Sequence, residues 1–534
     1  MAVLDKAPAD RGPAAAGITA GRVILGLVLS VISAIALFVM WGGNGSLWPL
    51  VFVGFVPMYV AAYRVLPPRL AAVPFAIAAF GYWLAMAMDG GGVLSVIVVY
   101  GIATVMALIW LGLGVFERRF TERTRYKWFI VQLPLLWVGL EILFGTNPFI
   151  GSNFWIAYRT AYIPAFVQPV SVVSTPALSF VLVMINAIIA LWILRWIDSR
   201  WPRLAERPIP ARTLKWSSII AVGVVVIWVA GSLLINASVN SGLGRSVRVA
   251  SVQTGITNTT SSGELGSGGE QGTPEDNARN TALQAQLTEM TMDASRQGAE
   301  LIVWPEEELN YDVREGDKGA WVGELAKRAN AVIVAGFQPE APDLASPNLA
   351  GVWFPDGTLQ SPVYAKKHAV IVEGEAFTPG TLSPVYETEF GDLGVMICFD
   401  HDFPDGPTRT TVAAGANIMA VPALDPYTIS ELRWQSLVFR AIENRVPLVK
   451  TDIGFDSAII NANGEVQTRS AVEDPAGETV LLVADVNIGP QGAPFTQTGG
   501  YPFALLVVLG VIARYARQVY LVRRGTATPE PADI

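Results

Sequence analysis

Cys398 is the only cysteine among 534 residues, and its place in the chain suggests a nucleophile. The apolar stretch 391–398 (GDLGVMIC) predicts a buried strand that ends at the thiol, and Asp400 follows two places later. A strand that delivers one thiol to its carboxyl end is one way in which a fold presents a catalytic cysteine. A lone cysteine is also common as a small core residue, so the neighbouring chemistry has to decide between the two interpretations.

Two further stretches supply a base and cations. Residues 301–306 (LIVWPE) predict a strand that ends in the carboxylate of Glu306, and residues 364–368 (YAKKH) carry two lysines. A thiol with an ordinary pKa of about 8.5 is mostly protonated at neutral pH, so it needs a base or a cation beside it. Glu306 can take the proton. Lys366 can stabilise the negative charge that develops on an attacked carbonyl oxygen.

The order Glu306, Lys366, Cys398, each at or just after a predicted strand, resembles the carbon–nitrogen hydrolase (nitrilase) superfamily. The resemblance implies a glutamate base, a lysine that stabilises the oxyanion and a cysteine nucleophile. The family's Trp-Pro-Glu and Tyr-x-Lys patterns select Glu306 and Lys366 over the adjacent Glu307 and Lys367. Strands and helices alternate between residues 247 and 464, which predicts an α/β domain. The resemblance further implies that this domain is a four-layer α-β-β-α sandwich.

The composition is too apolar for a soluble protein, with 52% hydrophobic residues, 15% charged residues and a mean hydropathy of +0.42. It indicates a membrane protein with a soluble portion. The net charge of −8 argues against nucleic acid as a partner. The two histidines, His368 and His401, leave little material for a zinc site or a Ser-His-Asp triad, and we expect neither a metal nor another cofactor. A pair between Cys398 and His401 is a weaker alternative, because three residues past a strand end is a poor spacing for a fixed contact.

Eight apolar segments of about bilayer length predict a polytopic helical membrane domain. They lie near residues 23–41, 48–66, 70–88, 93–116, 128–144, 177–197, 216–236 and 500–521. The fifth contains Glu141, and a carboxylate within a span usually faces protein or a polar cavity. Loops on the side of the N-terminus carry 20 Lys and Arg residues, whereas the short opposite loops carry only Arg159. By the positive-inside rule both termini are cytoplasmic.

This topology divides the chain into five parts. We expect a disordered cytoplasmic tail, a membrane domain of about seven helices, an extracytoplasmic catalytic domain, a closing transmembrane helix and a cytoplasmic tail, at residues 1–21, 22–239, 240–498, 499–522 and 523–534. The Gly/Ser/Thr-rich residues 257–272 predict a mobile segment beside the site. Residues 147–176 either lie beneath the catalytic domain or place Phe154 and Trp155 in an interfacial aromatic belt.

Several spans, an external nitrilase-like domain and one closing span together resemble the apolipoprotein N-acyltransferase family, from about residue 22 to 522. The motifs 153–155 (NFW) and 440–443 (RAIE) are similar to that family's membrane portion and late helix. The resemblance implies an enzyme of the bacterial inner membrane whose cysteine takes an acyl chain from a phospholipid. The resulting thioester would acylate the α-amine of a lipoprotein's diacylglyceryl-cysteine.

The chain departs from the family's pattern around this triad. The acid after the lysine motif is Glu375, with Glu373 as an alternative, and Asp400 replaces the family's glutamate after the cysteine. Asp425 and Tyr427 stand where the family has Asn-Asp-x-Trp, and residues 452–456 replace its Asn-x-Gly. With Tyr364 of the lysine motif, these are the candidate supporting or substrate-binding residues. The departures favour an altered acceptor and leave open a membrane-anchored amidase or nitrilase-like hydrolase, or a paralogue that binds lipid without turnover.

Overall fold

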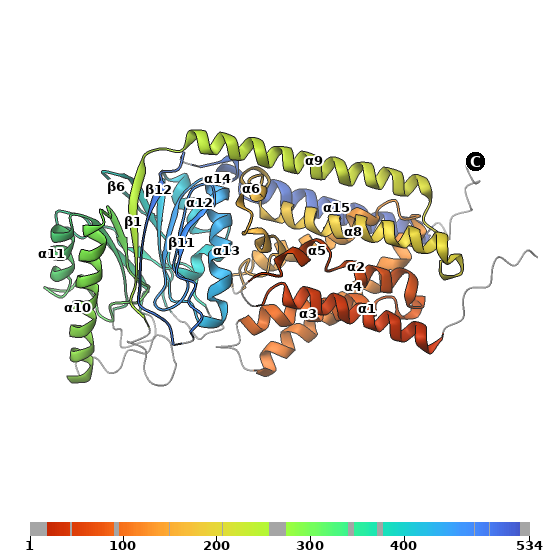
Figure 1. Cartoon of the computed structure of the whole chain (residues 1–534), viewed down its shortest axis with the longest axis horizontal. Coiled ribbons are helices and arrows are strands. Elements are labelled where there is room, and N and C mark those ends of the chain that lie inside the picture. The colour runs from red at the N-terminus through yellow and green to blue at the C-terminus, as the bar shows by residue number, and fades with distance from the viewer. Residues whose placement is uncertain are drawn as a thin grey trace, which may run out of the picture.

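The apolar segments form helices that lie side by side in one bundle (Figure 1). The computed structural model describes residues 19–523 except 43–44, 90–95, 149, 206, 256–273, 340–345, 371–376, 475 and 491. Within these residues, seven segments are long and apolar enough to cross a membrane, namely Ala20–Val39, Trp48–Val65, Pro68–Met88, Val96–Arg123, Thr175–Arg200, Ala211–Gly242 and Tyr501–Tyr520. The remaining predicted segment is a shorter apolar helix, α5 (Phe129–Gly145). The membrane character of the chain is thereby confirmed.

The long helices of the bundle are continuous, whereas the second apolar segment is broken and the third begins with a separate 3-10 turn at Pro68–Leu70. The α-helices are α1 (Ala20–Val39), α2 (Val56–Val60), α3 (Val73–Asp89), α4 (Val96–Arg123), α5, α6 (Pro164–Val167), α7 (Val170–Val173), α8 (Thr175–Arg200), α9 (Ala211–Gly242) and α15 (Tyr501–Arg523). Short 3-10 or π turns complete the second segment and the loop before α6, at Trp48–Phe52, Ala61–Val65 and Ile156–Thr160. Helix α9 runs the length of the bundle and leads directly into the first strand (Figure 1).

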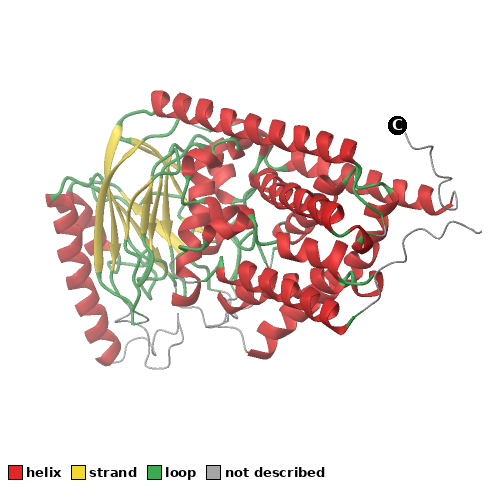
Figure 2. Ribbon diagram, turned by 45° about the vertical axis from the view of Figure 1, so that its right-hand side comes forward, coloured by secondary structure: helices red, strands yellow, loops and turns green. Residues whose placement is uncertain are grey.

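The chain after α9 folds into two facing six-stranded sheets (Figure 2). The first has the order β12-β1-β2-β3-β4-β5 and the second β11-β10-β9-β8-β7-β6. The strands are β1 (Ser246–Gln253), β2 (Leu301–Val303), β3 (Val332–Phe337), β4 (Leu349–Trp353), β5 (Tyr364–Ala365), β6 (Val385–Thr388), β7 (Gly391–Val395), β8 (Ile418–Pro422), β9 (Leu448–Thr451), β10 (Ala458–Ile460), β11 (Val466–Arg469) and β12 (Val480–Asn487). Central strands pair in parallel, β1–β2–β3 and β7–β8–β9, and the outer pairs are antiparallel.

Helices cover the outer face of each sheet. Helices α10 (Pro274–Arg296) and α11 (Ala320–Ala329) lie on the first sheet, whereas α12 (Pro407–Ala413), α13 (Tyr427–Asn444) and α14 (Pro494–Thr498) lie between the second sheet and the bundle (Figure 1). The four-layer α-β-β-α arrangement is therefore confirmed. Since the central strands are buried on both faces, they are continuous apolar runs such as LIV and IMAVP.

The loop between α5 and α8 is packed into protein. The side chains of Phe154 and Trp155 are 3% and 4% exposed, so the expectation of an interfacial belt is wrong for these two residues. The indole of Trp155 donates to the carbonyl oxygen of Glu141 at 2.9 Å, and the Glu141 carboxylate accepts from the amide of Ile156 at 2.8 Å. Glu141 thus faces protein, as a carboxylate within a span should. The predicted mobile segment 257–272 lies outside the described residues.

Candidate active site

Glu306 and Lys366 meet where strands of the first sheet end. Glu306 follows β2 by three residues and Lys366 follows β5 directly. The Lys366 Nζ lies 2.8 Å from Glu306 Oε1, and both side chains are at most 4% exposed. A buried pair of this kind is favourable only where further hydrogen bonds fix it.

Asn348 supplies those hydrogen bonds. Its Nδ2 donates to Glu306 Oε1 at 2.7 Å and to Glu307 Oε1 at 2.9 Å, and its carbonyl oxygen accepts from the amide of Lys366 at 2.9 Å. The residue therefore orients both members of the pair. The sequence analysis missed it, although a polar residue directly before the apolar strand β4 was a usable signal.

Cys398 begins a tight turn after the second sheet's strand β7. The strand ends at Val395, so the predicted strand to Cys398 is too long, and a 3-10 turn spans Cys398–Asp402. Cys398 has φ +40, a backbone conformation that a side-chain-bearing residue adopts only where its surroundings enforce it. Burial, together with the charges of Glu306 and Asp425, raises the pKa of the thiol well above its ordinary value, while Lys366 and Arg433 oppose the rise. The thiol is therefore protonated until a base takes its proton.

Asp400 ties the lysine segment to this turn. Its carboxylate accepts from the hydroxyl of Tyr364 at 2.6 Å, from the amide of His368 at 3.1 Å and from the amide of Ile397 at 3.2 Å. Burial and the Asp400 charge raise the pKa of Tyr364 well above its ordinary value, so its hydroxyl remains a donor. Asp400 thus joins the lysine segment, through Tyr364 and His368, to the turn that carries Cys398, through Ile397.

Asp425 is the hydrogen-bond partner of the thiol. Cys398 Sγ donates to Asp425 Oδ1 at 3.4 Å. Asp425 also pairs with Lys450 Nζ at 2.8 Å and with Arg433 Nε at 3.1 Å. These cations hold the pKa of the Asp425 carboxyl below its usual range despite its burial. The sequence analysis missed both cations; a lysine inside the apolar strand β9 was the one available signal for Lys450.

The other candidates are further from the thiol or outside the described residues. Tyr427 begins α13, is 39% exposed, and donates its hydroxyl to the carbonyl oxygen of Glu473 at 2.9 Å. Glu373 and Glu375 lie outside the described residues. Among the described residues, no hydrogen bond joins the ring of His401 to Cys398; the ring is fully buried, 3.5 Å from Asp402.

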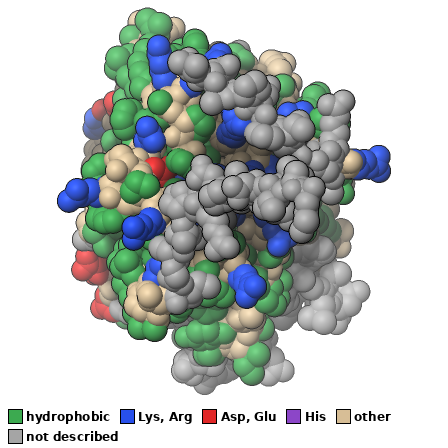
Figure 3. Space-filling view, turned by 90° about the vertical axis from the view of Figure 1, so that its right-hand side faces the viewer, with side chains coloured by type: hydrophobic (Ala, Val, Ile, Leu, Met, Phe, Trp, Pro, Cys, Tyr) green, Lys and Arg blue, Asp and Glu red, His purple; other side chains and the backbone are tan. Residues whose placement is uncertain are grey.

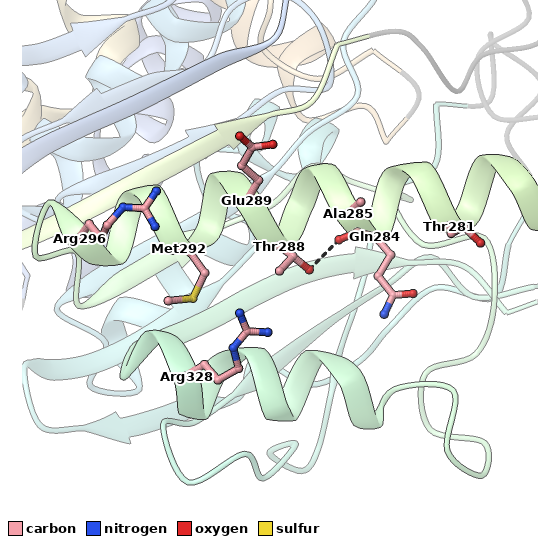
Figure 4. A pocket seen from close by; sticks show the side chains of 8 residues that line it. All are labelled: Thr281, Gln284, Ala285, Thr288, Glu289, Met292, Arg296 and Arg328. Atoms are coloured by element: carbon pink, nitrogen blue, oxygen red, sulfur yellow. Dashed lines mark hydrogen bonds between the residues drawn. The ribbon is translucent and has the colours of Figure 1, made fainter.

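The described part of the chain holds no candidate metal site, and a surface groove lies away from the thiol. It contains no group of three or more His, Cys, Asp or Glu side chains that could hold a metal ion. A groove of about 610 Å³ opens between α10 and α11, lined by Glu289, Met292, Arg296, Arg328 and four smaller or amide residues (Figure 4). None of the candidate site residues lines it, so it is separate from the cysteine.

Comparison with known proteins agrees with this geometry. Residues 248–489 match the carbon–nitrogen hydrolase family, and residues 23–188 match the N-terminal domain of apolipoprotein N-acyltransferase. An apolipoprotein N-acyltransferase of Geobacter metallireducens is 25% identical over 90% of this chain and 93% of its own length. A nitrilase of Pyrococcus abyssi is 33% identical over 36% of this chain and 75% of its own.

Among solved structures, an amidase from Nesterenkonia sp. has a TM-score of 0.36 and 20% identity over 46% of this chain and 92% of its own. The family matches and the Geobacter relative together cover both the helical bundle and the two-sheet domain. The chain belongs to the apolipoprotein N-acyltransferase family, whose α/β domain is of the carbon–nitrogen hydrolase type.

Proposed function

We propose that the protein transfers an acyl chain from a membrane phospholipid to the N-terminal amine of a diacylglyceryl-cysteine lipoprotein, through a thioester on Cys398. The observation that carries the proposal is the buried Glu306–Lys366 pair, whose charges both bear on the Cys398 thiol. The thiol sits on the side of the α/β domain that faces the apolar helices, since its turn contacts Ser152 of the bundle. A nucleophile on this side of the domain suits substrates that stay in a membrane.

In the first step Glu306 takes the thiol proton and the sulfur attacks the ester carbonyl carbon. Lys366 stabilises the oxyanion, a contribution of roughly 10²–10³ in rate. The ester C–O bond then breaks, the lysophospholipid leaves with the proton, and the acyl chain remains on sulfur. In the second step the lipoprotein amine attacks the thioester carbonyl carbon and Glu306 accepts the amine proton. The C–S bond then breaks, which releases the new amide and leaves the thiolate on Cys398.

The same proposal assigns the parts of the chain to compartments. Residues 22–239 and 499–522 span the bacterial inner membrane, residues 240–498 form the catalytic domain outside the cytoplasm, and the terminal stretches 1–21 and 523–534 are cytoplasmic. The 20-to-1 distribution of basic residues over the loops supports this orientation.

Incubation with donor phospholipid alone tests the thioester. Intact-mass analysis of the wild type should show one acyl adduct that hydroxylamine removes, and Cys398→Ala should show none. Glu306→Gln and Lys366→Met should form the adduct at least ~10²-fold more slowly, because each lacks a base or an oxyanion donor. An adduct that persists in Cys398→Ala would refute the mechanism.

Adding a diacylated lipopeptide tests the acceptor. If a lipoprotein is the acceptor, the acyl chain should move to the α-amine of the peptide. The departures from the family's pattern at Asp400, Asp425–Tyr427 and residues 452–456 favour a second candidate function, a membrane-anchored hydrolase that uses water as the acceptor. Rapid release of free fatty acid with no acylated peptide would identify water as the acceptor and the protein as a hydrolase.

A further inference from the structure

The bundle touches the nucleophile's turn directly. In the loop between α5 and α8, the amide and the hydroxyl of Ser152 both donate to the carbonyl oxygen of Asp402, at 2.9 and 2.6 Å. The preceding Gly151 has φ +65, and a Cβ added there would lie 2.9 Å from the Asp402 Cβ. Residues about 250 positions apart in the chain are therefore packed against each other where the Cys398–Asp402 turn ends.

Arg433 joins this contact from α13. Its Nη1 donates to Asn153 Oδ1 at 2.9 Å and also to the carboxylate of Asp402. Its Nε lies 3.1 Å from Asp425 Oδ1, and its side chain is 5% exposed. A planar guanidinium with several donors can hydrogen-bond to Asn153 and Asp402 and still lie beside a third group, the Asp425 carboxylate, whereas an ammonium group is a single point charge. One of these three partners, Asn153, comes from the bundle.

The oxygen that pairs with Arg433 is the one that accepts from the thiol. Asp425 Oδ1 lies 3.4 Å from Cys398 Sγ. The charged groups that bear on the thiol come from every side: Glu306 after β2, Lys366 after β5, Asp425 after β8 and Arg433 on α13. Lys450 on β9 pairs with the other oxygen of Asp425, and the neighbouring His401 is kept neutral by burial, which lowers its pKa.

Removing Arg433 would change the balance of charge at the sulfur. Among the described residues, two carboxylates and two cations act on it. Without the guanidinium the carboxylates outnumber the cations that act directly, and like charge disfavours the thiolate. Asp425 would also lose the group that fixes Oδ1 against the thiol.

We propose that Arg433 is a positioning residue for the nucleophile: held by Asn153 and Asp402, it fixes Asp425 beside Cys398 and stabilises the thiolate. The helical bundle thereby takes part in activating the cysteine, because Ser152 contacts Asp402 and Asn153 contacts Arg433. The consequence for acyl transfer rests on the proposed function, but the protonation of the thiol is measurable without any transfer.

The single cysteine makes the test direct, because alkylation of the full-length protein reports Cys398 alone. The rate of reaction with iodoacetamide is followed from pH 6 to 10 in detergent micelles. Arg433→Met should shift the midpoint of the pH profile to a pH about one unit higher. Below the midpoint, alkylation should then be about tenfold slower than in the wild type. Arg433→Lys should recover part of that loss, since it keeps the charge and loses the multiple contacts. Asn153→Ala should shift the profile in the same direction by a smaller amount.

Arg445→Met is the matched control. Arg445 caps the same helix and joins it to the bundle through Gln168 at 2.5 Å and Ser171 at 2.7 Å, but it is not among the charges that bear on the thiol. Its profile should match the wild type. Thermal unfolding by tryptophan fluorescence establishes which variants fold; if Arg433→Met does not, Arg433→Lys and Asn153→Ala carry the test.

Three outcomes would overturn the proposal: an unshifted profile in the Arg433 variants, an equal shift in Arg445→Met, or an unshifted profile in Asn153→Ala. If the alkylation profiles shift as expected but the wild type forms no acyl adduct, the result would count against the proposed function alone.

Discussion

Among the described residues, two carboxylates bear on the thiol, and their surroundings differ. Asp425 accepts the thiol hydrogen bond, but Lys450 and Arg433 hold its pKa low, which makes it a weak base. Glu306 is paired with Lys366. We therefore infer that Asp425 orients the thiol while Glu306 takes its proton. Separate environments for two neighbouring acids are a general way of dividing acid–base work.

Glu308, two residues after Glu306, should make the stability of the folded protein depend on pH. Its side chain is 5% exposed, and burial raises the pKa of its carboxyl from 4.5 to about 8. The folded state therefore holds one more proton than the unfolded state between those values. Protonated Glu308 therefore stabilises the folded state fully below pH 4.5. This stabilisation decreases by up to about 1.4 kcal/mol per pH unit as the pH rises from 4.5 to 8, and it is lost above 8.

Glu308→Gln keeps the neutral shape and removes the titration. We expect the melting temperature of the wild type to fall relative to this variant between pH 6 and 8.5, as measured by tryptophan fluorescence in detergent. The two curves should converge near pH 5. Parallel curves across the whole range would mean that Glu308 is ionised in the folded protein.

The proposed catalytic residues could be picked out from the sequence because the signal of each is local. Glu306, Lys366 and Cys398 each follow an apolar run, so three short stretches were enough to name them. Asn348, Arg433 and Lys450 could not be named, because their roles depend on which strand ends and helix faces meet. A buried arginine on α13 looks like any surface arginine until the bundle is placed against that helix.

At the scale of elements, α13 is the layer that joins the two halves of the molecule. Thirteen of its 18 residues are buried, including Arg440 and Glu443, whose side chains pair at 2.7 Å. Thr175, at the start of α8, donates its hydroxyl to Glu443 at 2.5 Å, and Tyr158 packs edge-to-face on Phe439 at 4.9 Å. The motif at 440–443 predicted a late helix here but not its burial, because its charges are typical of a solvated face.

Phe439→Ala should loosen this layer. The side chain is fully buried, and truncating a buried phenylalanine costs about 3–5 kcal/mol. We expect a lower melting temperature and faster proteolysis between the bundle and the α/β domain, both measured on the full chain. Leu382→Ala is the control, since Leu382 is 58% exposed and its truncation should leave both measurements unchanged. Equal behaviour of the two variants would show that α13 does not hold the halves together.

At the scale of the whole molecule, the charge pattern follows the architecture. Viewed from the end opposite the α/β domain, the bundle carries lysine and arginine side chains around its visible surface and few acids (Figure 3). The N-terminal end of α1, the connection between α8 and α9, and the C-terminal end of α15 all lie at this end (Figure 1). The α/β domain occupies the other end, so the basic loops and the cysteine are separated by the length of the bundle. By the positive-inside rule, this arrangement supports the proposed orientation, in which the basic end of the bundle is cytoplasmic.

The orientation can be tested with two introduced cysteines in a Cys398→Ser background, which removes the single native thiol. Asp356→Cys lies in an exposed turn of the α/β domain, and Arg203→Cys lies in the exposed connection between α8 and α9. In intact spheroplasts, a membrane-impermeant maleimide should label Asp356→Cys, because that turn is outside the membrane. Arg203→Cys should react only after the membrane is permeabilised. Labelling of Arg203→Cys in sealed spheroplasts, with Asp356→Cys protected, would place the catalytic domain in the cytoplasm. The substrates would then have to be reached from the inner leaflet, and a lipoprotein exposed on the outer side could not be the acceptor.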